Sequence, residues 1–170
     1  MSSGSYDGLA TKVTLEGGER VLIFAADWHK DIVDILVADA QEELKRLGVA
    51  ECEVIRVPGT YELPQAVAMY LNPDWPDFDS EPERDLPDGI ICFGVVVQGE
   101  TPHFTFISQA VADNLERVAC ESASVPVMFG VLTTNTEEQA MERANGKNSR
   151  KGIEVAHALG RMMEYAQSLR

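Results

Sequence analysis

Apolar residues gather in four short stretches of the chain, and each stretch predicts a β-strand. Three of them, residues 20–26, 89–97 and 125–132, are almost continuously apolar and rich in β-branched side chains. Such runs are typical of strands that are buried on both faces of a sheet. The fourth stretch, residues 51–57, alternates polar and apolar positions, which also predicts a strand.

Between the strands, apolar residues recur every three to four positions, the period of an α-helix. Helices are predicted at residues 31–47, where Gly48 provides the stop, at 60–71 and at 103–121. A capping-box pattern at residues 136–139 (TEEQ) starts a short helix, and residues 151–169 form an amphipathic last helix. Strands that alternate with helices favour a parallel sheet with helices on both faces. We therefore expect an α/β fold, a flavodoxin-like three-layer αβα sandwich with a four-stranded parallel sheet.

Two segments stand outside this alternation. Residues 1–18 are polar and contain glycine, and we expect an N-terminal arm that a neighbouring subunit could order. Residues 72–88 contain four prolines and seven acidic residues, which excludes a regular element and predicts an exposed acidic loop. Within it, Trp75 and Phe78 could pack on the surface. The remaining chain, residues 19–170, is expected to form a single domain with this loop as an insertion.

The composition excludes several classes of protein. With 28 acidic and 14 basic residues the net charge is −14, and a nucleic-acid partner is not expected because no basic patch stands out. No apolar run is long enough for a membrane helix, and the N-terminus lacks the apolar segment of a signal peptide. The three cysteines, Cys52, Cys92 and Cys120, lie in apolar surroundings at unrelated spacings. We interpret them as small core residues in a reducing compartment, with no metal site, and expect a cytoplasmic protein.

The stretch that follows the third predicted strand carries the most informative chemistry. It runs Gln98-Gly99-Glu100-Thr101-Pro102-His103 and leads directly into a helix. Thr101 can cap that helix, and Pro102 suits its first turn. Free backbone N–H groups at a helix start favour an anion, and His103 could move protons beside it. Taken alone, the same stretch favours an ordinary turn with an exposed histidine.

The carboxyl ends of the other strands carry further candidates, because ligands of wound parallel sheets bind at that edge. Trp28 can stack on a planar ring or pack in the core, and we favour an exposed helix-start histidine for His29. Gly59 permits close backbone approach. Glu62 can accept hydrogen bonds from hydroxyl groups or merely favour the helix dipole.

Three candidates come from the last part of the chain. Phe129 lies within a predicted strand, which favours the core. Arg143, followed by Lys147, Arg150 and Lys151, belongs to the densest basic cluster of an acidic protein. That cluster either pairs with a helix C-terminus or binds phosphate, for which a guanidinium is well suited.

Taken together, several motifs resemble the lumazine synthase family. They are VPGTYELP at 57–64, FGVVVQGETPHF at 93–104, VPVMFGVLTTNTEEQAMERA at 125–144 and KG at 151–152. Each motif alone is weak, whereas the combination, in this order and spacing from about residue 20 to the C-terminus, is specific. The family condenses 5-amino-6-(D-ribitylamino)uracil with 3,4-dihydroxy-2-butanone 4-phosphate in riboflavin biosynthesis, releasing phosphate and water. The resemblance therefore implies a transferase that uses no metal or cofactor.

By matching position, the resemblance also implies roles for residues that would bind the ribitylaminouracil. Trp28 would stack on the pyrimidine ring. The backbone at Val96 and Val97 would recognise the uracil edge. Glu62 and the backbone of Gly59-Thr60-Tyr61 would hold the ribityl chain.

The resemblance implies a second group of residues around the phosphate. Gly99-Glu100-Thr101 would cradle it, Arg143 would supply charge, and His103 would shuttle protons. Phe129 and Lys151, together with Arg143, would come from a neighbouring subunit, since the family's site lies between subunits of a pentamer.

The sequence departs from the commoner family pattern in several places. Gln98 replaces a basic residue, Trp28-His29 replaces an aromatic–asparagine pair, the acidic loop is longer, and residues 145–151 (NGKNSRK) replace a glycine-rich stretch. Family members form pentamers, decamers or sixty-subunit icosahedral shells, and riboflavin synthase is a further expected partner. A non-catalytic flavin- or lumazine-binding protein and a purely structural shell protein stay open as alternative functions.

Overall fold

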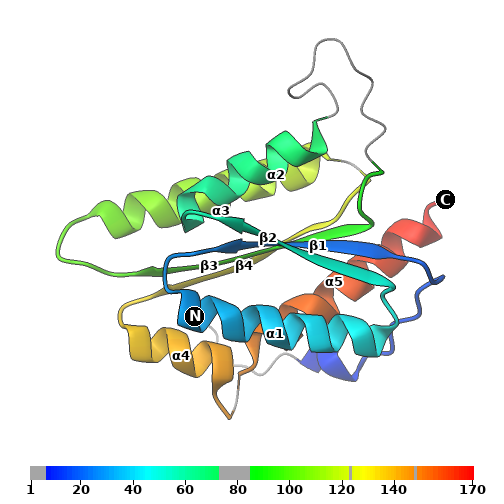
Figure 1. Ribbon diagram of the computed structural model, residues 1–170, viewed down its shortest axis with the longest axis horizontal. Coiled ribbons are helices and arrows are strands. Elements are labelled where there is room, and N and C mark those ends of the chain that lie inside the picture. Colours follow the sequence, from blue (N-terminus) through cyan, green and yellow to red (C-terminus); the bar gives the residue numbers. More distant parts are fainter. Residues whose placement is uncertain (1–6, 73–84, 123, 148) are drawn as a thin grey trace.

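The protein is a three-layer α/β sandwich in which one sheet lies between two layers of helices (Figure 1). The computed structural model describes residues 7–72, 85–122, 124–147 and 149–170. Its four strands are all parallel and lie in the order β2-β1-β3-β4. This confirms the expected flavodoxin-like fold with a four-stranded parallel sheet, and places β2 and β4 at the two edges.

Most element boundaries follow the predictions closely. The strands are β1 (Arg20–Ala26), β2 (Glu51–Val57), β3 (Gly89–Val97) and β4 (Val127–Thr134). The helices are α1 (Lys30–Leu47), α2 (Leu63–Leu71), α3 (His103–Glu121), α4 (Glu137–Asn145) and α5 (Lys151–Ser168). Short 3₁₀ turns occur at Asp7–Ala10 and Thr60–Glu62.

The prediction for β4 was wrong by two residues at each end. The strand begins at Val127, which pairs with Ile90, and it continues to Thr134, which pairs with Val97. Pro126 has no N–H to donate and lies just before the paired region. Its carbonyl oxygen instead accepts a hydrogen bond from the backbone N–H of Ile90 at 2.8 Å.

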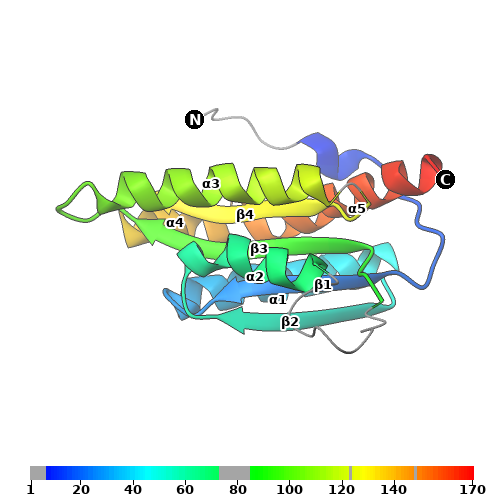
Figure 2. The ribbon, with the colours of Figure 1, turned by 90° about the horizontal axis from the view of Figure 1, so that it is seen from above.

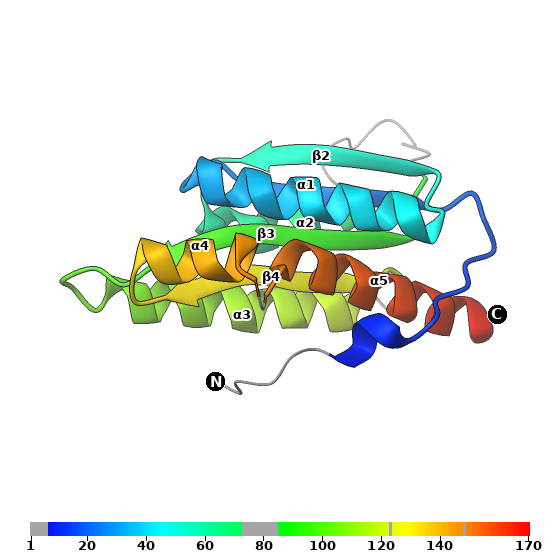
Figure 3. The same cartoon turned by 90° about the horizontal axis from the view of Figure 1, so that it is seen from below.

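Helices cover both faces of the sheet. Figure 2 shows α2 and α3 on one face, and Figure 3 shows α1, α4 and α5 on the other. Each face has its own apolar core, and β1 and β3 contribute alternate side chains to both. Full burial of one such side chain contributes about 1.5–3 kcal/mol, so the two central strands hold the layers together.

The three cysteines do not share one environment. Cys92 is buried, Cys52 is half-buried and Cys120 is exposed, so the prediction that all three are core residues was wrong for Cys120. Cys120 lies near the C-terminal end of α3 and is exposed to solvent. All three are free thiols.

The part of the N-terminal segment that the structure describes lies against α5 of its own chain (Figure 3). The backbone N–H of Thr14 donates to Glu164 at 3.2 Å, and Leu15 packs against the apolar core. Gly160 of α5 leaves room for Val13, which an added Cβ would approach within 3.2 Å. These contacts hold the described part of the segment, residues 7–18, against its own chain. The division into an arm and a single domain from residue 19 stays a prediction.

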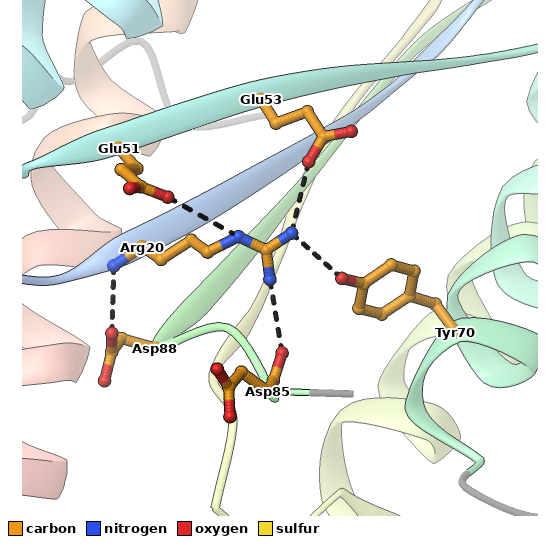
Figure 4. Close-up of polar contacts among 6 residues, drawn as sticks. All are labelled: Arg20, Glu51, Glu53, Tyr70, Asp85 and Asp88. Carbon is orange, nitrogen blue, oxygen red and sulfur yellow. Dashed lines mark hydrogen bonds and ion pairs between the residues drawn. The ribbon is translucent and has the colours of Figure 1, made fainter. Parts of the chain in front are cut away.

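The amino-terminal edge of the sheet is organised around Arg20 (Figure 4). Its guanidinium donates to Glu53 of β2 and to the hydroxyl of Tyr70 on α2, both at 3.1 Å, and lies 3.9 Å from a carboxylate oxygen of Glu51. One side chain thereby links β1 to a neighbouring strand and to a helix on the sheet face.

Arg20 also holds the chain where it returns to the sheet before β3. Its guanidinium donates to the carbonyl oxygen of Asp85 at 3.2 Å, and its backbone N–H donates to the Asp88 carboxylate at 2.9 Å. The predicted acidic loop ends here, whereas its residues 73–84, with Trp75 and Phe78, lie outside the described residues. The return point of that segment is therefore fixed to the sheet.

Candidate active site

A cavity of about 420 Å³ opens at the carboxyl ends of β1, β2 and β3. Its walls combine apolar strand ends with a few polar and aromatic side chains, as ligand pockets of this fold class do. The lining residues are Trp28, His29, Gly59, Thr60, Tyr61, Glu62, Val95, Val96, Val97, His103 and Ile107. Eight residues predicted to form the pyrimidine, ribityl and proton-transfer positions are thus brought together in one cavity.

Gly59 is the point where two cavity walls meet. A Cβ at this position would lie 2.8 Å from the carboxylate oxygen Oε2 of Glu62 and 3.4 Å from the indole carbon Cδ1 of Trp28. The missing side chain therefore lets the carboxylate and the ring approach the same stretch of backbone. Trp28 is 71% exposed and Tyr61 59%, so large aromatic surfaces face the opening of the cavity.

Thr60 joins the end of β2 to the end of β3. Its hydroxyl donates to the carbonyl oxygen of Val95 at 3.2 Å, and the residue is only 5% exposed. Gly94 makes this contact possible, because a Cβ there would stand 2.5 Å from the Thr60 hydroxyl oxygen. The floor of the cavity is thus a close contact between two strand ends.

His29 lies between β1 and α1 with an unusual backbone. Its φ of 53° and ψ of 44° are in the left-handed region, and its carbonyl oxygen accepts the first hydrogen bonds of α1, from Ile32 and Val33. The imidazole nitrogen Nδ1 lies 3.3 Å from a carboxylate oxygen of Glu137 on α4, and the side chain is 23% exposed. His29 is therefore partly buried in the cavity wall, and the prediction of a simply exposed histidine was wrong.

The loop of residues 98–102 leads from β3 into α3 beside the cavity. The prediction that Thr101 caps this helix was wrong: Pro102 occupies the N-cap position and no side chain caps the helix. A proline cannot continue a preceding turn of helix, since it has no N–H to donate, and its carbonyl oxygen accepts from Thr105 at 3.0 Å. Gly99, Glu100 and Thr101 are exposed, and backbone N–H groups at this helix start are available to an anion.

His103, the first residue of α3, is also exposed and lines the cavity. It therefore lies between the two groups of predicted residues. The loop of residues 99–101 precedes it directly in the chain, and Val97 of the cavity ends the strand before that loop.

Six predicted site residues do not line this cavity. They are Gly99, Glu100, Thr101, Phe129, Arg143 and Lys151. The first three lie in the adjoining loop, whereas the other three lie on β4, α4 and α5. A single copy of the protein therefore brings together the residues predicted for the pyrimidine ring, the ribityl chain and proton transfer. The arginine predicted to bind phosphate, Arg143, lies elsewhere.

Phe129 is 43% exposed, so the interpretation of this residue as part of the core was wrong. It lies on the edge strand β4 opposite Cys92, and its side chain borders a separate hollow lined also by Leu115, Glu116 and Val127. An exposed aromatic ring beside an apolar hollow on an edge strand is a surface suited to contact with another chain.

The basic turn between α4 and α5 is held firmly in place. Arg150 forms a two-fold contact with the carboxylate of Asp39 on α1, with one N–O distance of 2.7 Å. Gly152 lies against the same part of α1, since a Cβ there would stand 2.4 Å from the carbonyl oxygen of Leu36. Lys151 pairs with Glu154 at 3.0 Å, and the carbonyl oxygen of Arg143 accepts from Ser149 at 3.2 Å.

Two properties of the described residues bear on other classes of function. Within them, no three or more histidine, cysteine or carboxylate side chains are grouped so that they could hold a metal ion. None of the helices in the same part of the chain combines the length and apolar character needed to cross a membrane.

Comparison with known proteins identifies the family. Residues 18–167 match the family model described as 6,7-dimethyl-8-ribityllumazine synthase. The chain belongs to this family. It is 40% identical over 144 residues to the enzyme of that name from Streptomyces avermitilis, which covers 84% of this chain and 81% of the relative.

Other family members are similar over more of their length. The lumazine synthase of Leifsonia xyli subsp. xyli is 38% identical over 161 residues, covering 93% of this chain and 92% of its own. That of Levilactobacillus brevis is 38% identical over 152 residues, with 88% and 89% covered. The resemblance inferred from short motifs is therefore confirmed over nearly the whole chain.

Three cavity residues were not among the predicted site residues of this lumazine synthase family member. Val95 and Ile107 are apolar, and their places on β3 and α3 gave them the appearance of core residues. His29 was considered, but the sequence offered no signal for its left-handed backbone or its contact with Glu137.

Proposed function

We propose that the protein is a 6,7-dimethyl-8-ribityllumazine synthase that condenses 5-amino-6-(D-ribitylamino)uracil with 3,4-dihydroxy-2-butanone 4-phosphate. The observation that carries this proposal is the cavity at the carboxyl edge, where Trp28, Glu62 and His103 meet in a chain whose relatives bear that name. The product would serve riboflavin biosynthesis.

The ribitylaminouracil would occupy the cavity itself. Trp28 presents an exposed indole for stacking on the pyrimidine ring. The partly buried ends of β3 at Val96 and Val97 would offer backbone groups to the uracil edge. The Gly59-Thr60-Tyr61 backbone and the Glu62 carboxylate would hold the ribityl hydroxyls, since a carboxylate accepts hydrogen bonds from them.

The phosphate substrate would bind at the adjoining loop. Gly99, Glu100 and Thr101 precede α3, and the backbone N–H groups at its start favour an anion. Arg143 would add a guanidinium, which binds phosphate bidentately. Phosphate leaves more readily from a place lined by such donors, because they stabilise the charge that develops on it.

His103 would move the protons of the reaction. The amine of one substrate attacks the ketone of the other, and water is lost as the imine forms. Phosphate is then eliminated, the resulting enol becomes a ketone, and the ribitylamino nitrogen closes the ring on that carbonyl with loss of a second water. An imidazole can both accept and donate protons in these steps. Both substrates are intrinsically reactive, so much of the acceleration would come from holding them together, which can be worth about 7–11 kcal/mol.

We further propose that a neighbouring copy of the chain completes the site. Arg143, Phe129 and Lys151 do not line the cavity of their own chain, and Phe129 exposes its ring beside a hollow on an edge strand. A homo-oligomer built from pentamers would bring these residues to the next subunit's cavity. Pentamers, decamers and icosahedral sixty-subunit shells all satisfy this arrangement, and riboflavin synthase is a further proposed partner.

The cytoplasm is the proposed location. Cys52, Cys92 and Cys120 are free thiols, which suits a reducing compartment.

One sample tests both the reaction and the assembly. Purified protein is mixed with both substrates, and the absorbance of the lumazine product is followed against the uncatalysed reaction. Light scattering on the same sample distinguishes five subunits from ten or sixty. A rate no higher than the background would reject the proposed activity, and an active monomer would reject the shared site.

A further inference from the structure

His29 is the cavity residue that the proposed function leaves without a role. Among the described residues it is the single non-glycine residue with a positive φ. Histidine, asparagine and aspartate adopt this left-handed conformation more readily than other side chains do. Backbone strain of this kind tends to persist where it serves a binding or catalytic site.

The surroundings of His29 place its ring in the site. The residue follows Trp28 directly and lines the same cavity as Glu62 and His103. Its side chain is 23% exposed, so most of the imidazole is already packed into the wall. The left-handed backbone also starts α1, so the ring's position is set by the strand before it and the helix after it.

The carboxylate of Glu137 faces the Nδ1 side of the ring. This carboxylate lies 3.3 Å from Nδ1, and a carboxylate favours a proton on the ring nitrogen that faces it, so we infer that the neutral ring carries its proton on Nδ1. Nε2 then carries the lone pair and accepts a hydrogen bond, and it becomes a donor if the ring is protonated. The pairing resembles the way carboxylates orient histidines elsewhere in proteins.

The position of His29 also indicates which substrate it would contact. The cavity that it lines contains the residues proposed for the pyrimidine ring and the ribityl chain, but not Gly99, Glu100, Thr101 or Arg143. The ribitylaminouracil carries amine and hydroxyl donors that a neutral Nε2 can accept. We propose that His29, oriented by Glu137, is a substrate-binding residue that helps to hold the ribitylaminouracil against Trp28. This inference rests on the proposed function.

The first test removes the imidazole without straining the backbone. Glycine adopts the left-handed conformation at little cost, so His29→Gly should fold. We expect its Kd and KM for ribitylaminouracil to rise about 3- to 10-fold, as the loss of one hydrogen bond does. The KM for the butanone phosphate should stay within about twofold, because the phosphate residues lie outside this cavity. His29→Asn, which keeps a polar side chain suited to this backbone, should restore part of the affinity.

The second test separates orientation of the ring from support of helix α4. Glu137→Gln weakens the charged partner and should raise the same Kd about 2- to 3-fold. Glu138→Gln is the matched control, since Glu138 is the next residue in the same helical turn and has no contact with His29 among those described. Combined with His29→Gly, Glu137→Gln should have no further effect on the Kd.

Calorimetric titration with ribitylaminouracil alone keeps this inference distinct from the proposed reaction. Failure of the wild-type protein to bind that compound would reject the proposed function. If the wild-type protein binds and turns over normally, two results would overturn only the role of His29. One is unchanged affinity in His29→Gly. The other is an equal rise in the KM of both substrates, which would indicate a general loss of structure.

Discussion

The edge of the sheet where the strands begin (the amino edge) and the edge where they end (the carboxyl edge) use polar side chains in opposite ways. At the amino-terminal ends of the strands, Arg20 of β1 contacts the neighbouring strand β2, helix α2 and the chain that returns to β3 (Figure 4). At the carboxyl edge, Trp28, Tyr61 and His103 are exposed around a cavity. The polar groups at the amino edge stabilise the fold, whereas those at the carboxyl edge are available to ligands.

This contrast separates two kinds of mutational effect. Variants at the carboxyl edge should change kcat or KM while the free energy of unfolding stays nearly constant. Variants at the amino edge should lower the free energy of unfolding while kcat and KM stay constant.

The largest effect is expected at His103. His103→Ala should lower kcat about 10²- to 10⁴-fold, the usual contribution of a proton-transferring side chain. The free energy of unfolding should change by less than about 0.5 kcal/mol, because the residue is exposed. Turnover with both substrates and urea unfolding measure the two quantities. Thr105→Ala, an exposed neighbour in the first turn of α3, is the control, and a comparable loss of turnover there would undermine the assignment.

Arg143 should affect binding more than turnover. Loss of hydrogen bonds to a charged group costs about 1.5–3 kcal/mol, so Arg143→Ala should raise the KM for the butanone phosphate about 10- to 100-fold. Arg143→Lys keeps the charge without the bidentate geometry, so its KM for the butanone phosphate should lie between those of the wild type and Arg143→Ala. Steady-state kinetics with the phosphate substrate varied provide the measurement. Equal KM changes in Arg143→Ala and His103→Ala would contradict the division of roles.

At the amino edge, Arg20→Ala should lower the free energy of unfolding by about 1 kcal/mol. Its carboxylate partners are largely exposed, so each ion pair contributes little, and the tyrosine hydrogen bond adds a comparable amount. Tyr70→Phe removes only that last contact and should cost less. Urea unfolding gives the stability, and both KM values should match the wild type. A changed KM would show that the two edges are coupled.

The smallest effect concerns pH and the buried Glu43, near the end of α1 that lies at the amino edge. Burial by itself raises the pKa of Glu43, but hydrogen bonds from Arg46 and His157 outweigh burial and leave that pKa lowered. The stabilisation is therefore complete above the unfolded-state pKa near 4.5 and is lost as pH falls towards the folded-state value.

Glu43→Gln removes this ionisation and should flatten the fall in stability below about pH 5. The measurement is urea unfolding at a series of pH values. Glu121→Gln changes an exposed carboxylate at the end of α3 and should leave the profile as in the wild type. A Glu43→Gln profile as steep as that of the unmodified protein would mean that other groups account for the acid sensitivity.

Sequence reasoning was most accurate where one local signal dominated. Uninterrupted apolar runs located β1 and β3, and the motifs at the strand ends located most of the cavity. Sequence reasoning failed where contacts between segments distant in the sequence determine the exposure or the backbone conformation of a residue. Phe129 belongs to a strand, but the order of strands in the sheet, which periodicity does not encode, leaves β4 at an edge and its ring exposed. The left-handed backbone of His29 depends likewise on how β1 meets α1 and α4.

The hydroxyl of Thr60, tied to Val95 across the glycine at position 94, has one more consequence. The ends of β2 and β3 are already in contact there without a ligand, so the base of the pocket is preorganised. Binding a ligand therefore carries no additional cost in conformational entropy for ordering that base. Adaptation to altered substrates should therefore occur at the exposed rim, at Trp28 and Tyr61, where replacement does not disturb the interlocked base.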